Sequence, residues 1–214
     1  MTRVKLYDID IREPLFDFLE EEFGKVRILE EKMMGKSRAD IIAVLEDAIV
    51  GMEIKSDADT YVRLSRQIPD YDLFFDQNYI VVGNSHKAHV EEHVPEHWGI
   101  IVVEATPSGM VFSVLKKAKD NPNVNWTKKM GILWRPELVH LQELNEMPAY
   151  KQKSKLFVIE KILEKVPKEI LQYQVTNELF ERDYTTIAEQ INEYRIKNGQ
   201  KKRRKRKRRK NTMK

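Results

Sequence analysis

Two short runs of this 214-residue chain are almost wholly apolar, NYIVVG at 78–83 and GIIVVEA at 99–105. A strand with one solvated face alternates apolar and polar residues, whereas a strand covered on both faces reads as a continuous apolar run. The two runs therefore predict strands inside a sheet that carries helices on both faces. This feature restricts the chain to an α/β fold.

The neighbouring segments supply the other elements of such a fold. Residues 7–24 have helical periodicity, with Asp8 or Asp10 able to cap the start and Gly24 at the end. Further along, the pattern predicts strands at 25–34, 39–46 and 49–55, a helix over 56–76, and another helix over 85–94, capped by Ser85. The predicted order is α-β-β-β-α-β-α-β, a mixed sheet flanked by helices.

The pattern changes after residue 105. We expect four regions: a core over 1–105, a strand and loop extension over 106–130, a mostly helical region over 131–198, and a disordered basic tail over 199–214. The stretch 134–166 is similar to the helix–loop–helix of SAP-type DNA-binding modules. A plain helical hairpin packed on the core explains the same periodicity, because helical spacing alone does not imply binding.

The chain ends in a strongly basic run. Residues 201–214 carry 11 Lys and Arg and no acid, so the other residues have 27 basic against 34 acidic side chains, a charge of −7 rather than +4. Such a run cannot bury apolar surface and attracts polyanions. We expect it to bind nucleic acid, with a solubilising tail or a targeting signal as alternatives. Its predicted contact residues are Lys201, Lys202, Arg203, Arg204, Lys205, Arg206, Lys207, Arg208, Arg209 and Lys210.

Several classes of protein do not fit this sequence. It contains no cysteine, which excludes disulfides and thiolate metal sites. It has no apolar run of bilayer length and no signal-peptide pattern at its start. We therefore expect a cytoplasmic protein with no membrane partner.

Three charged residues lie in or beside the second and third predicted strands. Asp40 precedes the apolar run IIAVL, and Glu53 and Lys55 end the run IVGMEIK. Because side chains alternate faces along a strand, Glu53 and Lys55 point the same way. If these strands form the hairpin that their short turn predicts, Asp40 lies near Glu53. A structural sheet with incidental charges is the alternative.

Two carboxylates on one face repel each other, and a divalent cation removes that cost. Mg2+, or Mn2+ in its place, takes oxygen ligands and keeps several waters. A lysine beside such an ion can hold an attacking water while the ion stabilises charge on a phosphate. Asp40, Glu53 and Lys55 therefore predict a phosphodiester-cleaving site. A second Glu-x-Lys, at residues 30–32, is expected to carry only solvated charges.

The next predicted helix carries Gln67 and Tyr71, one turn apart on one face. Together with Asp40 and Glu53-x-Lys55, they resemble the motifs of the PD-(D/E)XK nuclease superfamily, and in particular its RecB-like branch with a Gln-x-x-x-Tyr element. The segments DIDIR, ADIIAV, EIKSDADT, IVVG and VPEHWGI are similar to those of a family of small bacterial and phage proteins assigned to that superfamily. The resemblance covers residues 7–105.

The resemblance implies a restriction-endonuclease-like core and magnesium-dependent cleavage of DNA. It implies that Asp40, Glu53 and the carbonyl of Ile54 bind the metal, and that Lys55 is catalytic. The other catalytic residues that it implies are Gln67, Tyr71 and, as an acid from the first helix, Glu13, with Asp10 as second choice. Pro69 lies between Gln67 and Tyr71 and removes a backbone hydrogen bond, which predicts a kinked helix.

Four basic residues flank the predicted site and are candidates for phosphate contacts: Lys36, Arg38, Arg63 and Arg66. The alternative is that they are ordinary surface charges. At the level of function, the alternative to a DNA nuclease is a catalytically inactive protein of the same fold that binds nucleic acid or a phage or host partner.

Four histidines recur at spacings of three and four: His86, His89, His93 and His97. On one helix face such residues could hold zinc. Because Pro95 should end the helix before His97 and the segment is rich in charged residues, a solvated helix face is the favoured interpretation.

Overall fold

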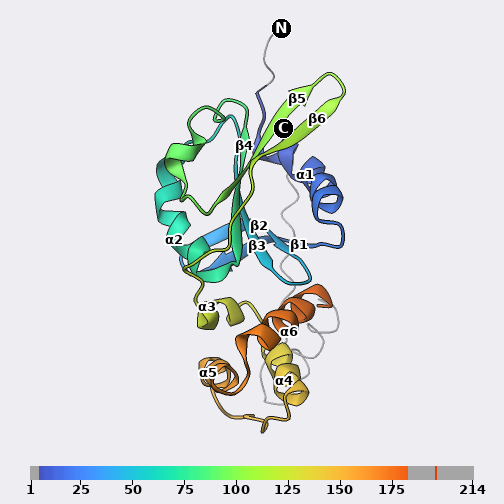
Figure 1. Cartoon of the computed structure of the whole chain (residues 1–214), viewed down its shortest axis with the longest axis vertical. Helices are drawn as coiled ribbons and strands as arrows, with labels where there is room; N and C mark the ends of the chain where they lie inside the picture. The colour runs from blue at the N-terminus through green and yellow to red at the C-terminus, as the bar shows by residue number, and fades with distance from the viewer. Residues whose placement is uncertain (1–4, 183–195, 197–214) are drawn as a thin grey trace. The chain divides into compact units, whose positions relative to one another are not determined.

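The computed structural model places six strands in one mixed sheet, in the order β1-β2-β3-β4-β5-β6 (Figure 1). The structure describes residues 5–182 and residue 196. The strands are β1 (Arg27–Met34), β2 (Ser37–Val44), β3 (Ile49–Lys55), β4 (Gln77–Gly83), β5 (Gly99–Thr106) and β6 (Gly109–Lys116). The pairs β3–β4 and β4–β5 are parallel, and the other pairs are antiparallel. The α/β class and the mixed sheet predicted from the apolar runs are thus confirmed.

Each face of the sheet carries its own apolar core. Helix α1 (Asp8–Phe23) covers one face with Ile11, Leu15 and Leu19, all fully buried. Helix α2 (Leu64–Phe74) covers the other face, with Tyr71 and the adjacent Phe75 in its core. Figure 1 shows α1 and α2 on opposite sides of the sheet. Because both faces are covered, β3 is buried along its whole length, as the apolar runs imply.

The helical region joins the core on the α2 face. It consists of α3 (Trp126–Met130), α4 (Arg135–Leu144), α5 (Lys155–Lys165) and α6 (Lys168–Phe180), and its apolar residues belong to the same cluster as those of α2. Lys129 is fully buried, and its Nζ lies 2.6 Å from Asp76 at the end of α2 and also contacts Gln172 of α6. This ion pair anchors the helices to the sheet.

The sheet continues past residue 105, where the sequence pattern changes. β6 pairs with β5 from Thr106↔Gly109 to Ile100↔Lys116, so the strand of the predicted extension completes the core sheet. Residues up to Phe180 form one compact unit. The end of the predicted helical region, residues 183–198, and the basic tail over 199–214 lie outside the described residues, residue 196 excepted.

One predicted helix is wrong. Residues 85–94 form turns and a short 3-10 helix, η2 (Val90–His93), with Val90 as its only buried residue. The segment lacks the apolar stripe that would hold a helix against the sheet. Ser85, expected to cap that helix, instead donates from its N–H (3.0 Å) and its hydroxyl (2.6 Å) to Asp57, which fixes the loop to the end of β3.

A smaller correction concerns the start of α1. The N-cap residue is Tyr7, and neither Asp8 nor Asp10 occupies that position. Asp10 accepts a hydrogen bond from the Tyr7 N–H at 2.9 Å, as in a capping box.

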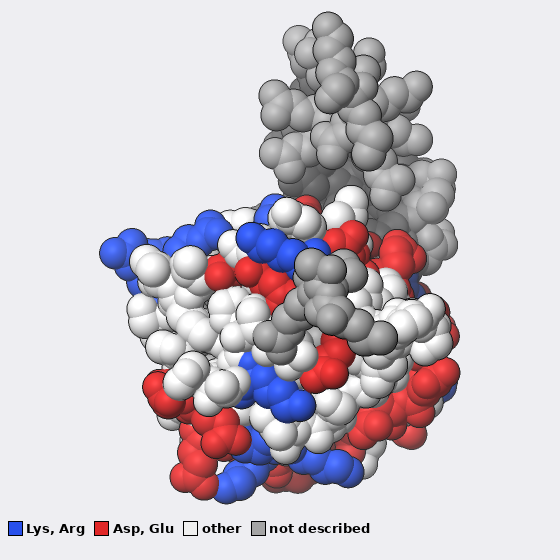
Figure 2. All heavy atoms as spheres, turned by 90° about the horizontal axis from the view of Figure 1, so that it is seen from above, with Lys and Arg blue, Asp and Glu red and all other residues white. Residues whose placement is uncertain are grey.

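At the surface, the face shown in Figure 2 has acidic and basic side chains interspersed among apolar and neutral residues.

Candidate functional site

Asp40 sits where β2 stops pairing with β3. The last pair of the two strands is Ile41↔Met52, and beyond it the Ile54 N–H donates to Asp40 Oδ2 at 3.0 Å. On the other neighbour of β2, Glu31 has a φ of 50°, in the left-handed region that non-glycine residues rarely adopt. The Asp40 carboxylate therefore takes the place of a backbone acceptor for the Ile54 N–H, and β2 and β3 separate at this point.

The end of β3 brings a second carboxylate and an ammonium group to this opening. Glu53 and Lys55 are 2% and 5% exposed, and they form a short ion pair with each other. Their common side of the strand, expected from strand alternation, faces α2. Ile54 points to the opposite core, although its backbone also lines the opening.

Helix α2 positions this pair with two side chains. Gln67 bridges it, donating to Glu53 Oε1 at 2.6 Å and accepting from Lys55 Nζ at 3.2 Å. Tyr71 Oη lies 2.7 Å from Glu53 Oε2 and 3.1 Å from the Met52 carbonyl. Because a phenol has one proton, the shorter contact to the carboxylate takes it. The structure therefore brings both residues of the Gln-x-x-x-Tyr element to Glu53.

Pro69 lies inside α2, which runs as one helix from Leu64 to Phe74. The lost backbone hydrogen bond does not end the helix, and Gln67 and Tyr71 keep the one-turn separation that aims both at β3. Tyr71 also accepts a long hydrogen bond, 3.4 Å, from the Asp40 N–H. One phenol thus contacts both strands of the opening.

The electrostatics of the site disfavour the charged form of Asp40. Burial, and then the charge of Glu53, raise the pKa of Asp40 to about 6. Burial and the neighbouring Glu53 and Asp40 raise the pKa of Tyr71 well above its ordinary value, which keeps it a neutral donor. Two carboxylates that disfavour each other's charge are the arrangement that a bound cation relieves.

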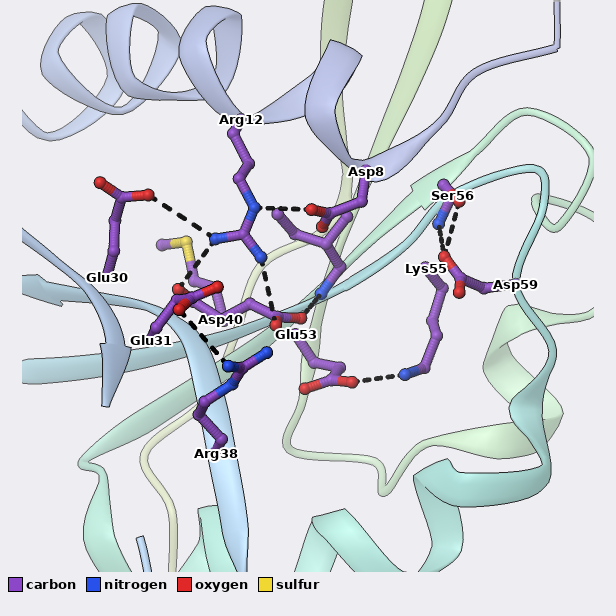
Figure 3. Close-up of polar contacts among 12 residues, drawn as sticks. Asp8, Arg12, Glu30, Glu31, Arg38, Asp40, Glu53, Lys55, Ser56 and Asp59 are labelled. Carbon is purple, nitrogen blue, oxygen red and sulfur yellow. Dashed lines mark hydrogen bonds and ion pairs between the residues drawn. The ribbon is translucent and has the colours of Figure 1, made fainter. Parts of the chain in front are cut away.

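Arg12 is a member of the cluster that sequence patterns did not identify. Its Nε lies 2.7 Å from Asp8, its Nη2 lies 3.3 Å from Asp40 Oδ1, and its Nη1 lies 3.8 Å from Glu30 (Figure 3). A signal was present in the sequence. Arg12 lies three residues before the buried Leu15, and Asp8 lies four residues before Arg12. The two charged residues therefore continue the helix face that carries Leu15 and Leu19.

The structure does not bring Glu13 to this cluster. Glu13 is exposed and is not among the residues that line the site, because it lies on the side of α1 opposite the stripe that faces the sheet. Asp10 is engaged at the helix start by Tyr7. Asp8 is the acid of α1 that lines the site.

An open pocket of about 480 Å³ connects these groups to solvent. All four basic residues that flank the site in sequence line it, and so do Asp40, Glu53 and Lys55. Lys36 and Arg38 come from the β1–β2 hairpin, where Arg38 also pairs with Glu31 at 3.4 Å. Arg63 and Arg66 line the pocket from the start of α2 and are exposed.

The four histidines make separate polar or ring contacts, and Tyr61 touches two of them, His86 and His93. His86 contacts the Ser56 carbonyl at 3.0 Å, and His89 contacts Glu92 at 3.0 Å. His93 stacks on Tyr61 with ring centroids 4.1 Å apart. His97 lies 3.1 Å from the buried carboxylate of Asp72. The segment is neither a solvated helix face nor a common ligand set, and no cluster of three or more His or acidic residues suited to a metal occurs among the described residues.

Comparisons with known proteins identify a family for this chain. A family model described as Bacteriophage P4 protein cII matches residues 2–207. The chain matches no curated protein and no solved structure. Within the part of the chain that the structure describes, no helix is long and apolar enough to cross a membrane.

Proposed function

For this chain, which belongs to the bacteriophage P4 protein cII family over almost its whole length, we propose metal-dependent cleavage of DNA by a core of the PD-(D/E)XK, restriction-endonuclease-like type. One observation carries this proposal. Asp40 of β2 and the pair Glu53 and Lys55 of β3 meet with Gln67 of α2 at one solvent-open pocket.

The residues present fit a divalent cation. Asp40 and Glu53 supply two carboxylates, Ile54 adds a backbone carbonyl, and all three residues line the same open pocket. Oxygen donors of this kind suit Mg2+ or Mn2+, which retain waters and need few protein ligands. Burial and the charge of Glu53 raise the pKa of Asp40, and a bound cation would counter both effects. A bound ion would stabilise the charge that develops on a phosphate during cleavage.

The surrounding side chains hold and orient the reacting groups. Lys55 is fixed by Glu53 and by Gln67 at 3.2 Å, so its ammonium group has one direction left, toward the pocket. There it can hold a water beside the phosphate or stabilise the phosphate charge. Tyr71 holds Glu53 from behind and, because its pKa is raised, remains a donor over the whole working pH range.

Basic residues that line the pocket can position the DNA backbone. Lys36 and Arg38 come from the β1–β2 hairpin, and Arg63 and Arg66 come from the start of α2. Phosphate contacts of this kind set register and orientation without reading sequence. The basic run at 201–210 would add a salt-sensitive attraction to the same substrate.

A second function has its own supporting observation. Every carboxylate oxygen of Asp40 and Glu53 already accepts a hydrogen bond from the protein, through Arg12, Ile54, Lys55, Gln67 or Tyr71. A site satisfied in this way is stable without a metal. It would suit a protein that retains the fold and binds nucleic acid without cutting it.

Cleavage of plasmid and single-stranded DNA in Mg2+ or Mn2+ tests the two functions. The variants Asp40→Asn and Lys55→Met should each lose roughly 100-fold or more of the rate, the usual effect of removing a general acid or base. The matched controls Glu96→Gln and Lys119→Met remove one member of an exposed pair outside the pocket and should cleave normally.

The results separate the alternatives. Equal cleavage by all variants would remove the assignment of this pocket. No cleavage at any metal concentration, with DNA binding that survives Asp40→Asn but is lost when residues 199–214 are deleted, would support the binding function instead.

A further inference from the structure

Arg12 occupies the position of a cation at the acidic opening. Its guanidinium contacts three carboxylates from three elements: Asp8 of α1, Glu30 of β1 and Asp40 of β2, at 2.7, 3.8 and 3.3 Å (Figure 3). The Arg12 and Asp40 side chains are only 15% and 17% exposed, so water screens this pair little. Arg12 therefore supplies the positive charge that Asp40 needs when no ion is present.

The three contacts are unequal. The Asp8 contact is the shortest, uses Nε, and lies within one helix at a spacing of four residues. The contacts to Asp40, through Nη2 to the carboxylate and Nη1 to the carbonyl, are both 3.3 Å, long for charge-assisted bonds. Releasing Asp40 thus breaks the weaker contacts and keeps the stronger one. Asp8 can serve as a pivot about which the outer nitrogens move.

We propose that Arg12 is an exchangeable counter-charge: it neutralises Asp40 in the metal-free protein, and a divalent cation takes Asp40 from it while Arg12 stays on Asp8. This inference rests on the cation site of the proposed function. Asp40 Oδ1, the oxygen that faces Arg12, is the only one of its two oxygens not committed to the backbone of β3. A metal that binds Asp40 through Oδ1 must therefore compete with the guanidinium.

A thermodynamic cycle on the full-length chain tests the exchange. Unfolding temperatures and calorimetric Mn2+ affinities are measured for the wild type and for Arg12→Met. Without metal, the variant should unfold at a lower temperature, because Asp40 loses its counter-charge. It should bind Mn2+ about tenfold more tightly, because the ion no longer displaces a side chain; a factor of ten corresponds to about 1.4 kcal/mol. At saturating Mn2+ the two unfolding temperatures should converge.

Two controls isolate the exchange from simple charge. Lys36→Met removes one positive charge from an exposed side chain of the same pocket that has no contact with Asp40, and it should change Mn2+ affinity by less than about threefold, as expected for a screened surface charge. Asp40→Asn should abolish the response to Mn2+, which places the ion at this carboxylate.

The outcomes are distinguishable. If Mn2+ binds at Asp40 but the wild type and Arg12→Met differ by the same amount with and without it, Arg12 is not displaced and the exchange is overturned, while the proposed function stands. A tenfold gain in Lys36→Met as well would reduce the effect to net charge and would also overturn the exchange. If neither wild type nor Arg12→Met binds Mn2+, the cation site fails and the inference fails with it.

Discussion

Replacing Asp40 with asparagine should stabilise the metal-free protein at neutral pH. The pKa of Asp40 is raised from 3.8 to about 6, by burial and by the charge of Glu53, so the folded state binds the proton more tightly than the unfolded chain. Ionised Asp40 therefore destabilises the fold. The penalty is absent below pH 3.8, develops as the pH rises to 6, and is complete above it.

The size of the effect follows from that difference. A shift of this extent corresponds to about 3 kcal/mol at roughly 1.4 kcal/mol for each pH unit. An asparagine returns part of the gain, because its NH2 group must face either the Arg12 guanidinium or the Ile54 N–H, both donors, at a cost of about 1 kcal/mol. We therefore expect a net gain of about 2 kcal/mol in the free energy of unfolding, which is large for a single substitution.

Urea unfolding in EDTA at pH 7.5 and pH 4 measures this. The gain should be present at pH 7.5 and largely lost at pH 4, where the wild-type carboxyl is protonated in the folded state and, close to its ordinary pKa of 3.8, about half protonated in the unfolded chain. Added Mg2+ should stabilise the wild type and leave the variant unchanged. A variant that is less stable than the wild type at both pH values would refute the claim that the two acids are held together against repulsion.

Two further substitutions test the side chains that fix a loop and the helical region to the sheet. Asp57→Asn should lower the free energy of unfolding by about 1–3 kcal/mol at pH 7.5, the range for a charged group that accepts several hydrogen bonds. Burial raises the pKa of Asp57, but hydrogen bonds from Ser85 and Leu6 outweigh burial and lower the pKa, so the loss of stability should shrink as the pH falls below 4. A loss that does not change with pH would contradict this account. Lys129→Met should cost about 3–5 kcal/mol in urea unfolding, because it leaves Asp76 partly buried without its ion pair. Lys161→Met, which removes a surface ion pair, is its control and should leave the urea midpoint unchanged.

The apolar runs were sufficient to locate the central strands. The run 49–55 forms β3 with the bounds that its pattern predicts, and 78–83 lies within β4, because a strand covered on both faces must be apolar along its length. The same alternation put Glu53 and Lys55 on one side. The spacing of Gln67 and Tyr71 predicted that they share a helix face, and the helix tolerates Pro69 between them.

Residues whose role depends on three-dimensional position could not be found in the same way. The left-handed backbone of Glu31 and the end of pairing at Ile41↔Met52 create the opening at Asp40, and neither has a local sequence signature. Arg12 was readable only as a charged residue on an apolar stripe. The loop over 85–94 was mistaken for a helix because its Ser85 resembles a cap, while its true partner, Asp57, lies 28 residues away.

The replacement of a backbone partner by the Asp40 side chain has a consequence for how the site could be lost. A valine or isoleucine in its place could not accept from the Ile54 N–H, and β2 and β3 would then be free to form a further backbone pair beyond Ile41↔Met52, which would narrow the opening. Sheet repair and loss of the opening would be one event. At this position a fully paired β2–β3 hairpin and the open pocket exclude each other, so a relative without the pocket could be recognised by strand pairing that continues past Ile41↔Met52.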